Sequence, residues 1–301
     1  MTETLRVAVP RKGRPLEAVL DRIAAGTGDT ELADSIASTL RYEKAIAKGK
    51  QTDERDVYDR LAAYSTLSDA GQPDYTLLRD DRAGMPRRIV FDSVTVETDG
   101  VDVQLIGREE PFRAVRTHDF ALGFDSADLV LEEVVGLREE PLASIDDLNA
   151  RIDPKDTDVR VVTGLGDTVY HTLMATPETR REGPADELSR EFVANYAGPL
   201  CISPRYERLV RAVLGTAAME DVTFCYPDDG REEEAAVADV GLGVYLTVTG
   251  STARDHGLEL GEQLFPSETV LMENVVETTQ EADAVKNLFA DAEFETALAV
   301  Q

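Results

Sequence analysis

Two short segments combine residue types that could bind phosphate. The first is Thr249-Gly-Ser-Thr252, which follows a β-branched run. Gly250 allows a turn in which backbone N–H groups converge, and the hydroxyls of Thr249, Ser251 and Thr252 add donors, a combination that suits a phosphate where a helix begins. An ordinary turn with a helix N-cap has the same composition. Phosphate binding and simple capping are therefore both open interpretations of this phosphate loop.

The second segment is the cationic turn Lys12-Gly-Arg14 near the N-terminus. It lies between a strand-like segment, Leu5–Val9, and residues Pro15–Ala25, whose apolar spacing predicts a helix. Lys12 and Arg14 can meet phosphates or a nucleotide there, or they can be solvated turn charges. Both this turn and the phosphate loop follow strands, and because ligands bind at the carboxyl ends of parallel strands we expect both to face one cleft.

Other candidate residues are single side chains. Asp125 ends the buried segment Asp119–Asp125 and either faces a ligand or caps a helix. Arg205 opens a basic helix after a proline, where it contacts a phosphate or belongs to a solvated helix face. The histidines have no partner visible in the sequence, and Cys201 and Cys225 lie in apolar runs that favour buried thiols over a disulfide or a metal site.

The composition describes a soluble, strongly acidic protein. Its 301 residues include 59 acidic and 31 basic ones, a formal net charge of −28 spread along the whole length. Such a surface is typical of proteins from organisms with concentrated internal salt, where screening relieves self-repulsion. The charge argues against a nucleic-acid partner. No apolar run reaches the roughly 18 residues of a membrane helix, and no signal-peptide pattern is present, so we expect a cytoplasmic protein.

Strands alternate with helices along the chain, which predicts an α/β fold with parallel sheets in two lobes. Residues 30–72 depart from this alternation, because their spacing predicts short amphipathic helices, and we interpret them as an insertion or a cap. A hairpin is predicted at 89–106, with Asp99-Gly100 as its turn. We expect further strands at 119–125, 159–163, 199–203, 222–226, 244–249 and 268–274, and helices at 110–118, 146–152, 187–196, 205–214 and 280–289.

Three motifs, taken in order, resemble the ATP phosphoribosyltransferase family, whose members catalyse the first step of histidine biosynthesis. The strand and turn Val7-Ala-Val-Pro-Arg-Lys-Gly-Arg14 is one residue longer than its family counterpart. Asp119-Phe-Ala-Leu-Gly-Phe-Asp-Ser-Ala-Asp-Leu-Val-Leu-Glu132 resembles the family's "DLGITGxDxLxE", again one residue longer. Thr249-Gly-Ser-Thr-Ala-Arg-Asp-His-Gly-Leu258 and Ser267-Glu-Thr-Val-Leu-Met-Glu-Asn274 are similar to "TGTTLxxNGL" and "SxAxLIxN".

This resemblance implies a two-lobed, type II periplasmic-binding-protein-like fold. The first lobe would span 1–150 with the insertion at 30–72, the second 151–260, and residues 261–301 would return to the first lobe. The implied reaction transfers a phosphoribosyl group from phosphoribosyl pyrophosphate to a ring nitrogen of ATP. Mg²⁺ would arrive on the substrate pyrophosphate, without dedicated protein metal ligands. A homo-oligomer is also expected.

The resemblance also implies roles for the candidate residues. Residues Thr249–Thr252 would hold the ribose 5-phosphate, and Lys12 with Arg14 would meet phosphates or the nucleotide. Asp125 or Asp128 would face the cleft, and Arg205 would give another phosphate contact.

One position departs from the family pattern. Four residues before the Thr-Gly of the phosphate loop the family has an acid that approaches the ribose hydroxyls, and this chain has Tyr245. Asp239, or an acid of the segment 228–234, can replace it if the register shifts. Otherwise the chain is a non-catalytic paralogue that binds or senses a phosphorylated ligand.

Overall fold

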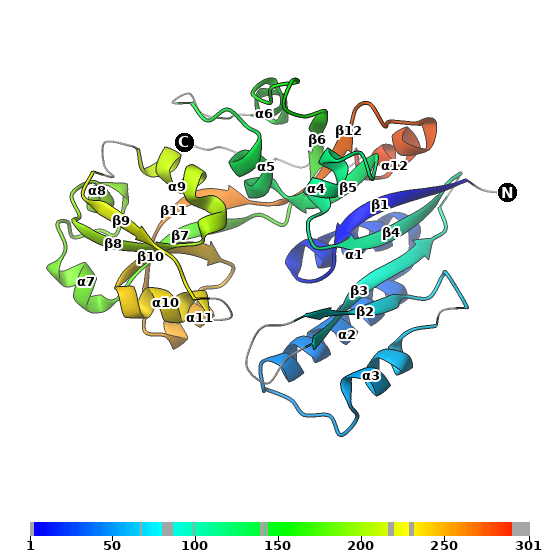
Figure 1. The fold of residues 1–301 in the computed structure, drawn as a ribbon, viewed down its shortest axis with the longest axis horizontal. Coiled ribbons are helices and arrows are strands. Elements are labelled where there is room, and N and C mark those ends of the chain that lie inside the picture. Colours follow the sequence, from blue (N-terminus) through cyan, green and yellow to red (C-terminus); the bar gives the residue numbers. More distant parts are fainter. Residues whose placement is uncertain are drawn as a thin grey trace. The chain divides into compact units, whose positions relative to one another are not determined.

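The computed structural model describes residues 3–66, 68–79, 87–98, 100–138, 142, 144–215, 220–228 and 232–290. The chain forms two compact units, drawn in Figure 1. Unit 1 comprises the described residues up to Ser126, Pro154–Asp167, and those from Thr269 onward; unit 2 comprises Ala127–Asp153 and Thr168–Glu268. The chain thus passes between the units more often than a division at residues 150 and 260 requires, because Ala127–Asp153 joins unit 2 and Pro154–Asp167 returns to unit 1.

Unit 1 is built on a seven-stranded mixed sheet in the order β2-β3-β4-β1-β5-β12-β6. β1 runs parallel to β4 and β5, whereas β12 runs antiparallel to β5 and β6. The strands are β1 (Thr4–Pro10), β2 (Asp74–Arg79), β3 (Arg87–Val96), β4 (Asp102–Arg108), β5 (Leu122–Ser126), β6 (Val159–Gly164) and β12 (Thr269–Asn274).

Unit 2 has a five-stranded sheet in the order β11-β7-β10-β8-β9. β8 runs parallel to β9 and β10, and β7 is antiparallel to both β10 and β11. The strands are β7 (Val169–Ala175), β8 (Gly198–Ile202), β9 (Val222–Cys225), β10 (Leu242–Thr247) and β11 (Glu259–Ser267).

The two sheets share one topology. The run β4-β1-β5-β12-β6 in unit 1 corresponds, strand by strand and in direction, to β9-β8-β10-β7-β11 in unit 2. β12 and β7 each follow a crossing of the chain from the other unit and run antiparallel to both of their neighbours. This paired α/β arrangement confirms the expected periplasmic-binding-protein-like fold class. It also gathers the carboxyl ends of three parallel strands at one edge of each sheet, where α/β proteins bind ligands.

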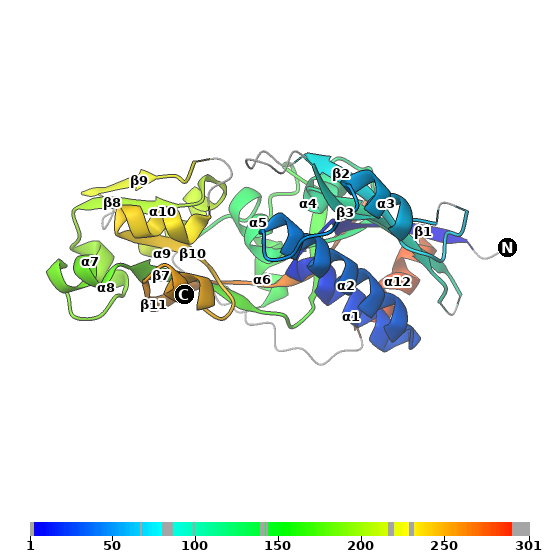
Figure 2. The same cartoon turned by 90° about the horizontal axis from the view of Figure 1, so that it is seen from below.

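Helices cover the sheets, as the two views in Figures 1 and 2 show. Side-chain caps fix several helix starts: Asp29 accepts from Leu32 N–H at α2, and Asp56 accepts from Tyr58 N–H at α3. Unit 1 contains α1 (Arg14–Thr27), α2 (Thr30–Ala47), α3 (Val57–Tyr64), α4 (Pro111–Arg116) and α12 (Gln280–Ala290). Unit 2 contains α5 (Ala127–Glu133), α6 (Ile145–Ala150), α7 (Pro177–Glu182), α8 (Arg190–Ala194), the 3₁₀ turn η1 (Pro204–Tyr206), α9 (Glu207–Leu214), α10 (Glu233–Val240) and α11 (Ser251–Asp255).

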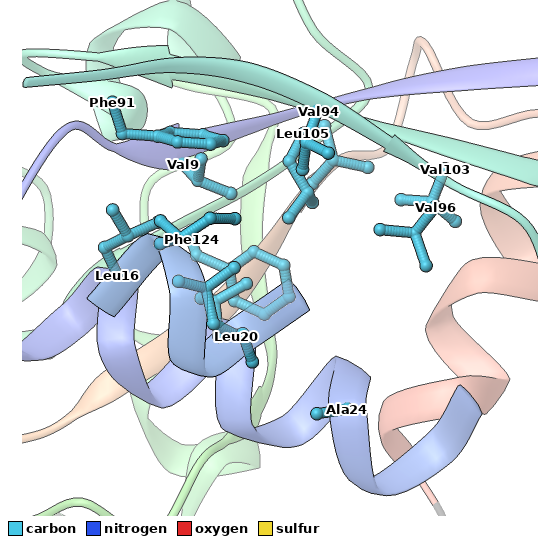
Figure 3. Close-up of a cluster of buried hydrophobic side chains, with 14 of the residues drawn as sticks. Val9, Leu16, Leu20, Ala24, Phe91, Val94, Val96, Val103, Leu105 and Phe124 are labelled. Atoms are coloured by element: carbon cyan, nitrogen blue, oxygen red, sulfur yellow. The ribbon is translucent and has the colours of Figure 1, made fainter. Parts of the chain in front are cut away.

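The core of unit 1 lies between α1 and the sheet. Leu16 and Leu20 on α1 point toward Val9, Leu105 and Phe124 on the strands, as Figure 3 shows, and all five are buried. The apolar spacing of Pro15–Ala25 therefore predicted the helix and its buried face correctly. Burying each such side chain contributes roughly 1.5–3 kcal/mol, which fixes the start of α1 against the end of β1.

The predicted insertion is helical and firmly joined to unit 1. α2 packs on α1 and β3. A buried ion pair joins it to α3: Arg60 Nε donates to Glu43 Oε1 at 2.8 Å, and Tyr64 donates to the same oxygen at 3.0 Å. Since Glu43 is only 3% exposed, its charge is balanced inside the insertion.

Most of the other predicted elements are present, with shifted ends. β3 and β4 pair antiparallel, which confirms the hairpin, although Asp99 of its turn lies outside the described residues. The helix expected at 187–196 is shorter, since α8 covers only Arg190–Ala194. The sequence analysis did not predict strands β2, β7 and β11. Polar and aromatic residues in these segments obscure the alternation of apolar and polar positions that is typical of a strand.

Candidate phosphate site in unit 2 and basic pocket in unit 1

The phosphate loop lies directly after the carboxyl end of β10 and opens α11. Gly250 has φ +68°, the left-handed region that favours glycine. Thr249 Oγ1 lies 3.1 Å from Ser251 Oγ and accepts from Ser251 N–H at 3.4 Å. The loop lines a pocket of about 230 Å³. Hydroxyls and main-chain donors are therefore gathered on one small cavity, in the arrangement that an anion requires.

Two charged side chains accompany the phosphate loop. Glu234, in the first turn of α10, lines the same pocket. Arg254 donates to the carbonyl of Thr249 at 3.0 Å and so holds the turn from its exposed side. Glu234 belongs to the segment 228–234, and among the described residues of that segment it is the acid that reaches the pocket.

Tyr245 does not face this pocket. Its side chain is 2% exposed, and its hydroxyl lies 3.8 Å from the sulfur of Cys201 on β8. Burial, with Cys201 as the nearest polar neighbour, raises the pKa of Tyr245. Cys201 and Cys225 are free thiols that sit opposite each other in the parallel register of β8 and β9. Tyr245 is thus a core residue, whereas Glu234 is an acid that lines the phosphate-loop pocket.

Arg205 follows β8, the parallel neighbour of β10, so it lies at the same edge of the sheet as the phosphate loop. Its side chain is exposed. The next arginine, Arg208, is structural: its guanidinium donates to the carbonyls of Glu132 at 2.6 Å and Val135 at 2.9 Å, and also to Leu131. Arg208 therefore closes the C-terminal end of α5, and Arg205 keeps its candidate role.

In unit 1 the turn after β1 opens onto a second pocket, of about 470 Å³. Lys12 and Arg14 line it, together with three cations that the sequence interpretation did not select. These are Arg41 and Lys44 from α2 and Arg88 from β3, and we call the set of five the basic pocket. The signal in the sequence was present, since the insertion carries three of the chain's six lysines.

Backbone and side-chain bonds hold the cationic turn. Phe91 N–H donates to the carbonyl of Arg11 at 3.0 Å, and Arg11 Nε donates to Gly107 O at 3.1 Å. Arg14 donates to the carbonyl of Asp167 at 2.6 Å and pairs with its carboxylate, which also accepts from Thr269 N–H at 2.7 Å. Arg14 thus ties the turn, through Asp167, to the points where the chain leaves unit 1 and returns to it.

The predicted carboxylates are engaged elsewhere. Asp125 accepts from Phe112 N–H at 3.1 Å, which caps α4, and from Ser126 N–H at 2.9 Å. The cap is on the preceding helix rather than the following one. Asp128 is buried in unit 2, with Oδ2 2.7 Å from Nε2 of His171. The His171 ring stacks on Phe265 with centroids 4.3 Å apart, so this pair belongs to the core.

In the described ranges no group of three or more His, Cys, Asp or Glu residues is placed to hold a metal ion. Nor is any helix there both long and apolar enough to cross a bilayer.

Residues 1–300 match the model of one protein family, described as halobacterial ATP phosphoribosyltransferase. The chain belongs to this family. The match spans both units and all three motifs that carried the resemblance. The function of this protein is therefore ATP phosphoribosyl transfer in histidine biosynthesis, as the resemblance implied. No curated protein matches significantly.

Solved structures are similar to this ATP phosphoribosyltransferase family member over nearly its whole length. An ATP phosphoribosyltransferase complex from Thermotoga maritima has 14% identity over 95% of this chain and 94% of that one, with a TM-score of 0.45. A periplasmic domain of BvgS from Bordetella pertussis has 11% identity over 96% and 88%, with a TM-score of 0.42. An ancestral amino-acid-binding protein has 8% identity over 95% and 86%, with a TM-score of 0.38.

Proposed function

We propose that the phosphate loop of unit 2 holds the ribose 5-phosphate of phosphoribosyl pyrophosphate during transfer to ATP. The observation that carries this proposal is the joint presence of Thr249, Ser251, Thr252 and Glu234 on one pocket at the end of β10. A phosphate monoester needs several hydrogen-bond donors, and the hydroxyls of this loop can supply them. Arg205, at the same edge, supplies a further cation.

Glu234 takes the place of the acid that Tyr245 replaces. In the reaction a ring nitrogen of adenine bonds to the anomeric carbon while the C–O bond to pyrophosphate breaks. Positive charge develops on the ribose as this bond opens, so a carboxylate beside the ribose hydroxyls orients the sugar and stabilises that charge. The position of Glu234 on the phosphate-loop pocket supports this role.

Lys12 and Arg14 neutralise phosphates of the leaving group or of the nucleotide. Their place at the carboxyl end of β1, on a cationic pocket, supports this assignment. Asp125 acts on the same edge by fixing the start of α4 rather than by touching substrate.

Magnesium enters as part of the substrate in this proposal. Mg²⁺ binds oxygen ligands and keeps several waters, so a pyrophosphate satisfies most of its needs.

The remaining expectations belong to the proposal as well. The protein works on small-molecule substrates in a salt-rich cytoplasm, as a homo-oligomer and without nucleic acid. The net charge of −28 supports the salt-adapted setting and opposes binding to a polyanion.

The direct test is pyrophosphate release from phosphoribosyl pyrophosphate and ATP in molar KCl with Mg²⁺, with mass analysis of the nucleotide product. We expect stoichiometric formation of phosphoribosyl-ATP and pyrophosphate, and loss of both when either substrate is omitted. Ligand-dependent thermal stabilisation without any product would instead identify a binding or sensor protein.

A further inference from the structure

The insertion adds positive charge to a basic pocket in a chain that is acidic as a whole. Five cations line the basic pocket: Lys12 and Arg14 from the turn, Arg41 and Lys44 from α2, and Arg88 from β3. Among the described residues of this lining, Glu17 is the one carboxylate. Arg14 and Arg41 pair with Asp167 and Glu17, and the described lining still keeps a net positive charge, which favours an anion in a chain of net charge −28.

The geometry of α2 fixes the two insertion cations. Arg41 and Lys44 are three residues apart and so share one face of the helix. The flanking residues Leu40 and Glu43 are buried, which orients that face. Arg41 is also held in place, because its guanidinium lies 2.7 Å from Glu17 on α1. The fold therefore places both residues on the pocket, and the contact with Glu17 orients the guanidinium of Arg41.

The size and charge of the basic pocket favour a chain of phosphates over a lone phosphate. Its volume of about 470 Å³ falls in the range of small-molecule sites. Five cations drawn from three elements match a ligand with several negative charges along its length. In molar salt the Debye length is about 3 Å, so only cations in direct contact with the ligand contribute to its binding. A ligand with several negative charges therefore needs several such cations.

We propose that α2 supplies Arg41 and Lys44 as polyphosphate ligands, so that the insertion completes a polyphosphate-binding pocket around the Lys12–Arg14 turn. This inference deepens the proposed function, on which it rests for the identity of the substrates. The pyrophosphate of phosphoribosyl pyrophosphate and the triphosphate of ATP share this chemistry. The insertion thereby becomes part of the substrate site instead of a mere structural addition.

The experiment measures binding of inorganic pyrophosphate and inorganic triphosphate by calorimetry, with and without Mg²⁺, in molar KCl. The variants are Arg41→Gln, Lys44→Gln and the double variant. Lys50→Gln is the matched control, because Lys50 lies in the insertion, is exposed and does not line the pocket. We expect about tenfold weaker binding for each pocket variant and an unchanged Kd for the control. Unchanged binding of both anions in the double variant would overturn the proposal.

Steady-state kinetics show whether the pocket binds the triphosphate of ATP or the pyrophosphate of phosphoribosyl pyrophosphate. A rise in KM confined to ATP assigns the pocket to the triphosphate, and a rise confined to phosphoribosyl pyrophosphate assigns it to the leaving group. The charge-preserving pair Arg41→Lys and Lys44→Arg should retain anion binding, which guards against a folding defect in the glutamine variants. If the wild-type protein binds pyrophosphate through these residues but forms no product, the proposed function fails while the inference stands. If turnover is normal and all variants bind both anions as the wild type does, the inference fails while the proposed function stands.

Discussion

The hydroxyl of Tyr245 lies 3.8 Å from the sulfur of Cys201, inside the core of unit 2. The residue that departs from the family pattern thus packs in the interior while Glu234 lines the phosphate loop. The departure is therefore compatible with catalysis.

Tyr245→Phe should leave the enzyme active. The substitution removes only a long contact to a thiol, so we expect kcat/KM within about twofold of wild type and a loss in the free energy of unfolding under about 1 kcal/mol. Tyr245→Asp, which restores the family's residue type, should instead cost about 3 kcal/mol or more, because it buries a carboxylate without a partner. Steady-state assays and urea unfolding test both. A rise in kcat/KM in the aspartate variant would contradict this account.

Glu234→Gln should lower kcat/KM for phosphoribosyl pyrophosphate by about 10- to 100-fold, the value of a hydrogen bond to a charged group. The reason is loss of the negative charge beside the ribose. Asp239→Asn on the same helix, an exposed residue that does not line the pocket, is the control and should keep full activity. Equal activity of the two variants would remove Glu234 from the site.

Gly250→Ala should weaken phosphate binding. The new Cβ would lie 2.4 Å from Leu260 Cδ1 and 3.1 Å from Arg254 Nη1, in a backbone with φ +68°. Gly257→Ala is a matched control, since Gly257 has φ +70° but no atom within 4 Å of the added carbon. Both should lose about 1–2 kcal/mol of stability, and only Gly250→Ala should raise the KM for phosphoribosyl pyrophosphate about tenfold or more. A similar rise in both variants would argue for backbone strain alone.

His171→Phe should destabilise unit 2. Phenylalanine keeps the stacking on Phe265 but leaves Asp128 buried without the imidazole, which costs about 3–5 kcal/mol. Adding Asp128→Leu should recover most of that loss, because it removes the stranded carboxylate. Chemical unfolding of the wild type, the two single variants and the double variant gives the coupling free energy between His171 and Asp128. A change below about 1 kcal/mol in His171→Phe would show that the pair is not coupled.

Stability should fall at alkaline pH through Cys201. Burial raises the pKa of its thiol to about 11, above the usual value near 9. Between these values the folded state holds the proton more tightly than the unfolded state, so the free energy of unfolding falls as pH rises, by up to about 3 kcal/mol. Urea midpoints at pH 8 and pH 11 measure the fall. In Cys201→Ala the free energy of unfolding should fall less between these two pH values. An equal fall in the variant and the wild type would show that other groups cause the pH dependence.

The local sequence pattern was sufficient to predict the secondary structure around the cationic turn and the phosphate loop. The strand, cationic turn and helix at Leu5–Ala25 are present because apolar spacing and a glycine act over a few residues. The loop at Thr249–Thr252 formed as expected for the same reason, since Gly250 and its hydroxyl neighbours bond within the turn.

What the sequence by itself determined was the α/β class, the local form of the two segments proposed to bind phosphate, and the family to which the chain belongs. Only the tertiary structure decided that Tyr245 points inward, that Asp125 and Asp128 serve backbone and core, and that α2 adds Arg41 and Lys44 to the basic pocket. The physical reason is distance along the chain. Turns and helix faces follow from neighbouring residues, whereas the side of a strand that is buried, and the partner that a charge finds, depend on packing between segments tens of residues apart.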